Sequence, residues 1–205
     1  MRMRWMAGLL VAGVAALAIA APAQAGLLVS SATDCDDQVY EQPFLPWADP
    51  ASYVLAPGGT FEQGAGDWRL SGNASVVSGN ESHYVHAAGD SSSLSLGSGS
   101  SATSDSMCVG IEHPTLRLFA ARTGGSLLST LKVEVLFEGS GGSVHALPIG
   151  LLLAGNQWQP TLMMPVVANL LPLLPGEHTA VAFRFTANGG SWKIDDVYVD
   201  PYRSR

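Results

Sequence analysis

The chain has 205 residues, of which 17 are acidic and 10 are basic, so its formal net charge at pH 7 is −7. An acidic surface argues against nucleic-acid binding, because contacts with phosphates need a basic surface. The length is enough for one sizeable hydrophobic core, and we expect a single folded domain.

The first 25 residues have the layout of a secretory signal peptide. Arg2 and Arg4 precede an apolar run that ends near Ala20, and the sequence Ala-Pro-Ala-Gln-Ala then leads to an expected cleavage after Ala25. The apolar run is shorter than the ~20 residues that a membrane-spanning helix requires. We therefore expect residues 1–25 to be removed, the mature protein to be secreted, and no membrane span to remain.

Residues 26–57 have no sustained hydrophobic period, and we expect an extended lead-in that packs on the edge of the domain. The chain has two cysteines, Cys35 and Cys108, without the spacing of a metal site. In an oxidising compartment this predicts one disulfide, which would tie the lead-in to the domain. Closing a loop of about 70 residues would stabilise the fold by roughly 4 kcal/mol in the chain-entropy model.

In residues 58–202, short apolar stretches alternate with clusters of Gly, Ser, Asn and Pro, a pattern typical of a β-sandwich. Apolar residues occupy every second position in 131–138 and again in 179–186, which is the period of a strand. Residues 192–199 form a closing strand, and Asn188-Gly189-Gly190 before it predicts a hairpin. Further strands are expected at 60–62, 67–70, 75–77, 84–87, 93–96, 115–121, 143–149 and 157–163.

The expected fold is therefore all-β, a two-sheet antiparallel β-sandwich of the jelly-roll type with one disulfide. The Gly- and Ser-rich stretches 89–106 and 139–143 are expected to be surface loops, since strand patterns continue on both sides. Residues 166–174 are apolar but contain a proline, and we expect a loop that covers one end of the core.

Acidic residues occur in both the first and the last predicted strand. Glu62 follows Phe61, and the last strand contains Asp195 and Asp196. A sandwich that pairs its first and last strands could gather these carboxylates around one cation, and Ca²⁺ binds through such oxygens. The alternative is that they are solvated charges at strand edges.

The two ends of the domain resemble a known family. Phe61-Glu62, Gly66-Asp67-Trp68 and the segment 192–199 are similar to the first and last strands of carbohydrate-binding modules with a galactose-binding-like jelly roll. The resemblance implies one structural Ca²⁺ held by Glu62 and Asp195. The segments 108–119 and 192–202 also look similar to uncharacterised secreted proteins of actinobacteria, which implies a compartment and a fold but no activity.

Sugar binding needs exposed aromatic faces that stack on pyranose rings, with a few polar groups that recognise hydroxyls. The candidate ligand-binding residues are Trp158, Tyr84, Trp47 and Tyr198. Each could instead be a core or edge residue, as we expect for Trp68 and Trp192.

We expect no enzyme, because neither a Gly-x-Ser-x-Gly nor a His-Glu-x-x-His motif occurs. His83 and His86 would lie on opposite faces of a strand, which argues against a zinc site. A glycosidase needs two facing carboxylates, and the sequence leaves a pair open among four glutamates: Glu112, Glu134, Glu138 and Glu177.

These features favour a non-catalytic secreted module that binds a carbohydrate or a cell-surface polymer. The alternative is a structural or protein-interaction domain of the cell envelope without a glycan ligand, and the third hypothesis is an unrecognised hydrolase. An exposed row of aromatic side chains on one sheet face would favour the first hypothesis. An apolar patch above a few hundred Å² without a cleft would favour the second, and a buried carboxylate pair in a groove the third.

Overall fold

The structure is a computed structural model that describes residues 38–110, 115–139, 142–153, 155–166 and 178–200. Within these ranges the chain forms strands and one 3₁₀ turn, η1 (Leu45–Trp47), and no α-helix. None of these residues belongs to a helix long and apolar enough to cross a membrane. The predicted signal peptide and the apolar segment 167–174 lie outside the described residues.

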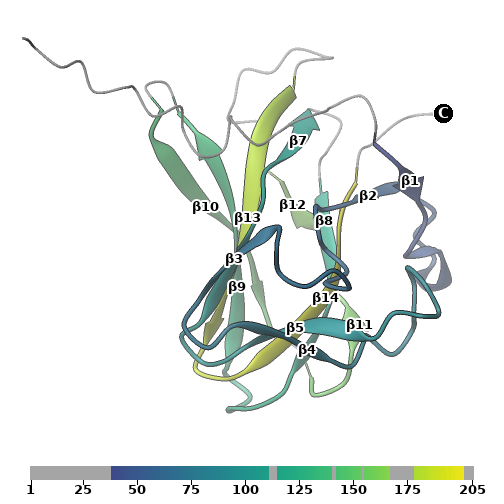
Figure 1. The fold of residues 1–205 in the computed structure, drawn as a ribbon, viewed down its shortest axis with the longest axis vertical. Coiled ribbons are helices and arrows are strands. Elements are labelled where there is room, and N and C mark those ends of the chain that lie inside the picture. The colour runs from purple at the N-terminus through teal and green to yellow at the C-terminus, as the bar shows by residue number, and fades with distance from the viewer. Residues whose placement is uncertain (1–37, 111–114, 140–141, 154, 167–177, 201–205) are drawn as a thin grey trace, which may run out of the picture.

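Two antiparallel sheets form a sandwich (Figure 1), which confirms the predicted all-β class. In the first sheet, sheet A, the neighbours follow the order β1-β2-β14-β5-β4, and β8 pairs with the other edge of β14 and carries β11 and β12. The strands of sheet A are β1 (Tyr40–Glu41), β2 (Tyr53–Leu55), β4 (Ser75–Ser78), β5 (Ser92–Leu96), β8 (Thr115–Arg122), β11 (Gln159–Pro160), β12 (Met164–Pro165) and β14 (Trp192–Asp200).

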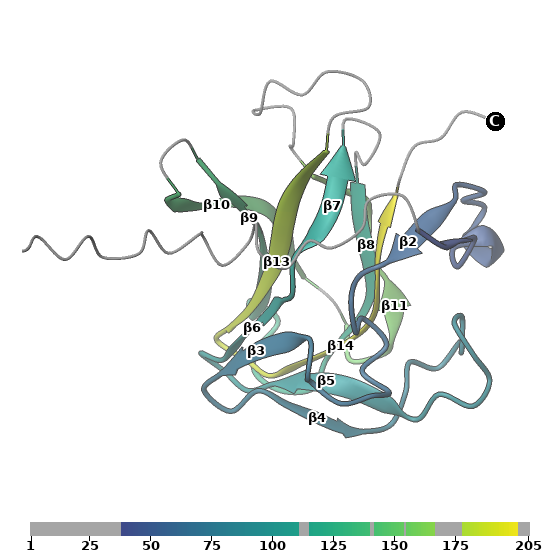
Figure 2. The same cartoon turned by 45° about the horizontal axis from the view of Figure 1, so that its top comes forward.

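The second sheet, sheet B, has the order β10-β9-β13-β6-β3, with β7 also paired to β13. Figure 2 shows β9, β13 and β7 facing the layer that contains β14 and β5. The strands of sheet B are β3 (Trp68–Ser71), β6 (Ser101–Ser104), β7 (Met107–Gly110), β9 (Thr130–Glu138), β10 (Val144–Leu152) and β13 (His178–Asn188).

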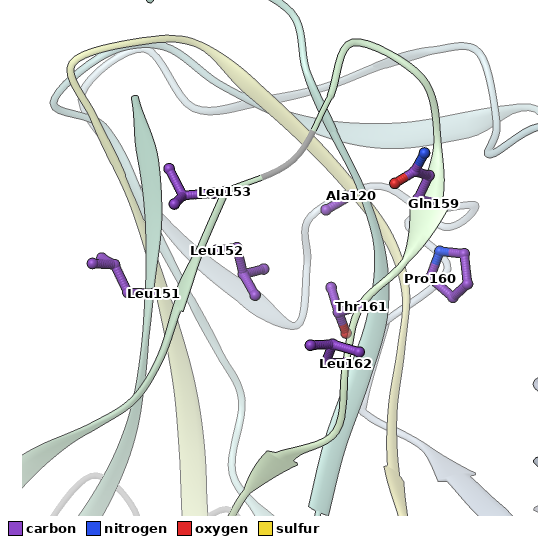
Figure 3. A pocket seen from close by; sticks show the side chains of 8 residues that line it. All are labelled: Ala120, Leu151, Leu152, Leu153, Gln159, Pro160, Thr161 and Leu162. Carbon is purple, nitrogen blue, oxygen red and sulfur yellow. The ribbon is translucent and has the colours of Figure 1, made fainter. Parts of the chain in front are cut away.

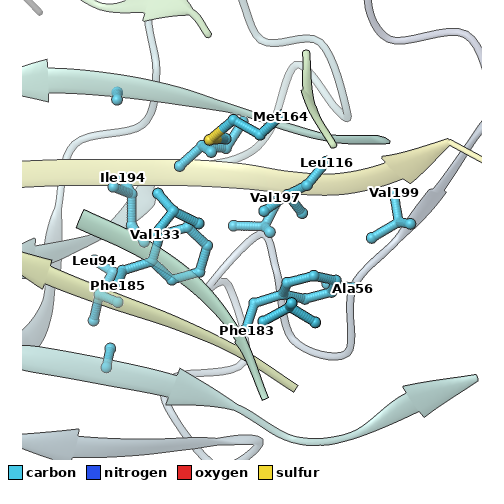
Figure 4. Close-up of a cluster of buried hydrophobic side chains, with 14 of the residues drawn as sticks. Ala56, Leu94, Leu116, Val133, Met164, Phe183, Phe185, Ile194, Val197 and Val199 are labelled. Carbon is cyan, nitrogen blue, oxygen red and sulfur yellow. The ribbon is translucent and has the colours of Figure 1, made fainter. Parts of the chain in front are cut away.

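The main core lies between the two sheets, where apolar side chains from both inner faces meet (Figure 4). Phe183 and Phe185 of β13 and Val133 of β9 are fully buried there, as their alternation predicts. Trp192 and Ile194 of β14 pack into the same cluster from sheet A. Fully burying a side chain of this size contributes about 1.5–3 kcal/mol each, so this layer dominates stability.

Three local predictions are wrong. Residues 60–62 lie in a turn and residues 84–87 in an irregular bend, where Phe61 and Tyr84 have positive φ angles of 58° and 52°. The Ser-rich stretch expected to be a loop contains β6, whose Ala102 is buried in the core while Ser104 is buried at its end. Small side chains carry little hydrophobic signal, so this strand is stabilised by tertiary pairing with β13 and β3 rather than by its own sequence pattern.

Cys108 lies on β7, opposite Ala180 of β13, and is buried. Its predicted partner Cys35 lies outside the described residues. The disulfide between these two cysteines therefore stays a prediction.

Candidate functional site

The outer face of sheet A is covered by the segment that precedes β2. On β8, Leu116 and Leu118 point into the main core, so Phe119 points to the outer face. There it forms a second buried cluster with Phe44, Tyr53 and Tyr198. η1 and its flanking residues lie across β8 and β14 and shield this aromatic cluster from solvent.

The aromatic rings of this cluster fix the position of η1. The ring of Phe44 lies 5.6 Å from that of Phe119 and 4.8 Å from that of Tyr53, measured between centroids. Trp47, at the end of η1, makes edge contacts with Phe119 at 5.3 Å and with His83 at 4.9 Å. Such aromatic pairs add about 0.5–1.5 kcal/mol each beyond the area that they bury.

Arg117 is the only basic side chain of the described chain that is buried, and it lies on the outer face of β8 beside this cluster. Its guanidinium carbon lies 4.1 Å from the centroid of the Phe44 ring, its Nε donates to the Thr161 carbonyl at 3.0 Å, and its Nη1 donates to Asp49. The remaining nitrogen, Nη2, makes no hydrogen bond within the described part of the chain.

Asp49 is the acidic partner of Arg117 and is itself fixed by two further donors. Its Oδ2 accepts a hydrogen bond from the Tyr53 hydroxyl at 2.7 Å, and its Oδ1 accepts one from the Ala51 amide at 3.1 Å. Burial alone would raise the pKa of Asp49, but the hydrogen bonds from Tyr53, Ala51 and Arg117 outweigh it and hold the pKa below its usual value. Asp49 is therefore a carboxylate at neutral pH.

These residues border a shallow pocket of about 300 Å³, which we call the Trp47 pocket. The half-buried indole of Trp47 and the ion pair of Asp49 and Arg117 lie in its wall. Its other lining residues are Ala48, Pro50, Leu162 and Met163. The pocket thus combines an aromatic surface, apolar edges and two oppositely charged groups that are held in place.

A second, apolar pocket of about 420 Å³ lies between the end of β10 and β11 (Figure 3), and we call it the leucine groove. Leu151 and Leu153 are 64% and 68% exposed, and Leu162, which is 85% exposed, borders both pockets. The other lining residues are Ala120, Leu152, Gln159, Pro160 and Thr161.

The four predicted sugar-binding aromatics do not form one row. Trp47 lines its pocket, and half-buried Trp158 packs against the aromatic cluster from β11's side. Tyr84 is 51% exposed at a turn and stays a candidate. Tyr198 is fully buried with its hydroxyl donating to Glu41 at 2.7 Å, so its ring has no face for a sugar and the prediction for Tyr198 is corrected.

Asp49 and Arg117 were missed by the sequence analysis. Arg117 is a single cation inside the otherwise apolar stretch 116–121, which could have marked it as a buried, paired side chain. Asp49 stands two residues after Trp47, but nothing in the sequence indicates that the lead-in folds back over β8. That contact depends on tertiary packing.

The two residues that the family resemblance assigns to calcium bind backbone amides instead. Glu62 Oε1 accepts hydrogen bonds from the Ser91 and Ser92 amides at 2.8 and 2.6 Å. Asp195 Oδ2 accepts one from the Glu81 amide at 2.9 Å, and its Oδ1 accepts one from the Asp196 amide at 3.0 Å. Each of these carboxylates keeps further acceptor positions beside these amide hydrogen bonds, so the calcium site that the resemblance implies stays a prediction.

Among the four glutamates left open as a glycosidase pair, Glu134 is bound by two cations. Glu134 forms ion pairs with Arg184 at 2.8 Å and Lys132 at 3.0 Å. Burial would raise the pKa of Glu134, but these two cations outweigh burial and lower it. A general acid needs a raised pKa, so Glu134 has the wrong environment for that role. Glu112 and Glu177 lie outside the described residues.

The described histidines do not gather either. His86 contacts Asp90 at 2.8 Å, whereas His83 packs against Trp47. No group of three or more His, Cys, Asp or Glu side chains within the described ranges is arranged to hold a metal ion.

Solved structures with a similar arrangement include several carbohydrate-binding modules. The CBM22-1 xylan-binding domain of Paenibacillus barcinonensis Xyn10C has 14% identity and a TM-score of 0.48, over 72% of this chain and 94% of that one. The CBM22-1 and GH10 modules of Clostridium thermocellum endo-1,4-beta-D-xylanase 10B, complexed with xylohexaose, have 13% identity and a TM-score of 0.49, over 71% of this chain and 28% of theirs.

TmCBM61, complexed with beta-1,4-galactotriose, has 19% identity and a TM-score of 0.39, over 72% of this chain and 97% of that one. No protein-family profile and no curated protein matches this sequence. These values are too low to assign a family or a ligand. What the comparisons add is that carbohydrate-binding modules are among the solved structures to which this chain is similar.

Proposed function

We propose that this protein is a secreted, non-catalytic module that binds a carbohydrate or a cell-surface polymer, and that one sugar unit occupies the Trp47 pocket. The observation that carries the proposal is the combination of a half-buried indole with the Asp49–Arg117 pair in one shallow pocket of about 300 Å³. A sugar ring presents apolar C–H faces and polar hydroxyls, and the pocket offers a partner for each.

In this proposal, the charged side chains of Asp49 and Arg117 bind the hydroxyl groups of the sugar. Arg117 Nη2 can donate to a sugar oxygen, and Asp49 can accept from a sugar hydroxyl, because a carboxylate oxygen has more than one acceptor position. Hydrogen bonds to charged groups are stronger than those between neutral groups. Both side chains are already fixed by three partners each, so little conformational entropy is lost on binding.

The remaining binding surface is proposed to lie next to this pocket. Met163, which is 60% exposed, and Leu162, which is 85% exposed, also line this pocket. Trp158 and Tyr84 are proposed as additional contacts for a polymer that is longer than the pocket. A polymer ligand agrees with an open pocket, because the neighbouring units can leave it along the surface.

The test is retention of residues 26–205 on a panel of insoluble polysaccharides and cell-wall preparations, followed by calorimetric titration with the soluble oligosaccharide that reverses retention. Trp47→Ala and Asp49→Asn are expected to weaken binding at least about tenfold, which corresponds to about 1.4 kcal/mol. Leu128→Ala is the control, since Leu128 is 86% exposed and lines neither pocket.

Thermal unfolding of each variant separates loss of the site from loss of the fold. Trp47 also packs against Phe119, so Trp47→Ala is expected to lower the melting temperature. Asp49→Asn keeps the side-chain shape but loses the charged hydrogen bond to Arg117, so it is also expected to melt lower at neutral pH. Wild-type affinity in both folded variants would exclude the Trp47 pocket as the sugar site.

A second function is favoured by the leucine groove. Leu151, Leu153 and Leu162 are exposed and border one apolar pocket, as a surface that binds a protein partner would require. If no matrix retains the mature protein, a protein-interaction or structural domain of the cell envelope becomes the preferred function.

A further inference from the structure

The turn between β8 and β9 exposes two adjacent leucines, which we call the leucine tip. Leu127 and Leu128 are 81% and 86% exposed. They occupy the centre of a turn in which the Ser129 amide donates to the Ser126 carbonyl at 3.0 Å. The centre of a turn favours Gly, Pro, Asn, Asp or Ser. Single exposed apolar residues are common on protein surfaces, but an adjacent pair at such a position indicates an interaction site.

The leucine tip is held in place by close packing against the β13–β14 hairpin. Gly125 has φ 93°, and a Cβ atom added to it would lie 2.6 Å from the Gly190 Cα. The Ser129 hydroxyl donates to the Gly189 carbonyl at 2.8 Å, and Ser129 is only 2% exposed. The Ser191 amide donates to the Gly124 carbonyl at 3.1 Å. Because the backbone below it is fixed, the leucine tip loses little conformational entropy when it binds a partner.

The exposed apolar surface continues onto the neighbouring connection, between β10 and β11. Leu153, which is 68% exposed, directly follows the last residue of β10. Arg122 joins the two connections, because its amide donates to the Gly155 carbonyl at 2.9 Å and its Nη1 donates to the Ser126 carbonyl. The leucine tip and Leu153 therefore lie at the same end of the sandwich, with a guanidinium between their connections.

The connections at this end of the sandwich contain no acidic residue. The strand register brings five of them together, and in the sequence they are residues 72–74, 97–100, 123–129, 153–158 and 189–191. None of them contains Asp or Glu. The charged residues within three positions of these connections are all basic: Arg69, Arg122, Lys132 and Lys193.

The positive charge at this end contrasts with the rest of the chain, whose formal net charge is −7. Lys132 forms an ion pair with Glu134 at 3.0 Å, so the local excess comes from the other three cations. An acidic protein is repelled by an anionic surface, and an end with cations and without carboxylates is where such a surface is approached most easily. The apolar tip and the positive charge thus point to the same partner.

We propose that this end of the protein binds the surface of an anionic lipid bilayer, with Leu127 and Leu128 inserted between the lipid headgroups. Burial of apolar side chains and attraction between cations and anionic lipids add together in such binding. The leucine tip protrudes, so a protein partner would need a groove that fits it, whereas a fluid lipid surface adapts to its shape. The inference does not depend on sugar binding, because the leucine tip lines neither pocket.

The test is flotation of the mature protein with vesicles of phosphatidylcholine, either alone or mixed with phosphatidylglycerol. The wild type is expected to float with the mixed vesicles and to be released as the salt concentration rises. The double variant Leu127→Ser, Leu128→Ser is expected to lower the partition coefficient at least about tenfold. Its melting temperature should equal that of the wild type, since both positions are exposed.

Val39→Ser is the matched control, because Val39 is 72% exposed and precedes β1, far from the leucine tip in the sequence. This variant should float like the wild type. Trp47→Ala should also float like the wild type, and the double leucine variant should bind the sugar like the wild type. A failure of lipid binding is therefore distinguished from a failure of sugar binding.

Three results would overturn the proposal. The first is a wild type that floats with neither kind of vesicle, and the second is a double leucine variant that floats as well as the wild type. The third is equal flotation with vesicles of phosphatidylcholine alone, which would exclude an anionic lipid as the partner. If sedimentation velocity shows a wild-type dimer that the double variant converts to a monomer, and no vesicle binds, a second copy of the chain is the partner instead.

Discussion

At the residue scale, the candidate site depends on one carboxylate that is held in its ionised form. Asp49 accepts hydrogen bonds from Tyr53, Ala51 and Arg117, and together these outweigh the effect of burial and lower its pKa. A group whose pKa is lower in the folded state stabilises the fold above its unfolded pKa, near 3.9, and this contribution is lost as the pH falls through the folded pKa.

We therefore predict how the stability of Asp49→Asn compares with that of the wild type at different pH values. Above about pH 5 the variant should be less stable by about 1–3 kcal/mol, because the charged hydrogen bond to buried Arg117 is lost. The difference should shrink toward zero as the pH falls below about 4. Urea unfolding of both proteins between pH 2.5 and 7 measures this difference in unfolding free energy. A difference that does not vary with pH would contradict the claim that the charge of Asp49 stabilises the fold.

At the same scale, the sequence indicates aromatic candidates but not their environment. Trp47 and Tyr198 are equally plausible sugar-stacking residues in the sequence, yet Trp47 borders a pocket and Tyr198 is fully buried. The difference arises because the lead-in covers the outer face of β14 and β8, a contact between segments that are distant in the sequence. Arg117 and Asp49 are 68 residues apart and could not be paired from the sequence for the same reason.

At the element scale, strands with clear alternation are predictable and strands of small residues are not. The segments 131–138 and 179–186 are strands with the predicted inward faces, and they pair in register, with Val135 opposite Phe183. β6 has only Ser, Ala and Thr, so its pattern resembles a loop. β14 also has a β-bulge, a shift in its register against β8 between Asp195 and Tyr198, which the sequence does not reveal because Ile-Asp-Asp-Val is compatible with a regular strand.

β6 is held to β13 by a side chain as well as by the backbone ladder, which gives a prediction for this element. Buried Ser104 accepts a hydrogen bond from the Phe183 amide at 2.9 Å. Ser104→Ala leaves this amide without a partner and should destabilise the fold by about 1–3 kcal/mol. Ser71→Ala, at an exposed position of β3, is the matched control and should change stability by less than about 0.5 kcal/mol. Equal urea midpoints for the two variants would contradict the role of this hydrogen bond.

At the scale of the whole molecule, the sequence predicted two antiparallel sheets around one core, because alternation and turn residues repeat along the chain. It did not predict that sheet A is covered on both faces. The lead-in was expected at the edge of the domain, whereas β1 and β2 extend sheet A and Phe44 helps to form a second core over it. That second core is what places Trp47 beside Arg117.

The predicted disulfide belongs to this scale, since it would fix the lead-in that forms the pocket wall. Titration of free thiols in the denatured, unreduced mature protein should find none, and reduction should lower stability by about 2–4 kcal/mol. Two reactive thiols per chain would show that Cys35 and Cys108 are not paired.

The central claim is that a sugar unit binds in the Trp47 pocket, and the most direct measurement compares two variants by calorimetric titration with the oligosaccharide that releases the mature protein from its matrix. Trp47→Ala changes the Trp47 pocket, and Leu151→Ser changes the leucine groove without touching that pocket. We predict that Trp47→Ala weakens binding at least about tenfold and that Leu151→Ser leaves the affinity unchanged. Wild-type affinity in folded Trp47→Ala, with a loss of binding in Leu151→Ser, would contradict the account.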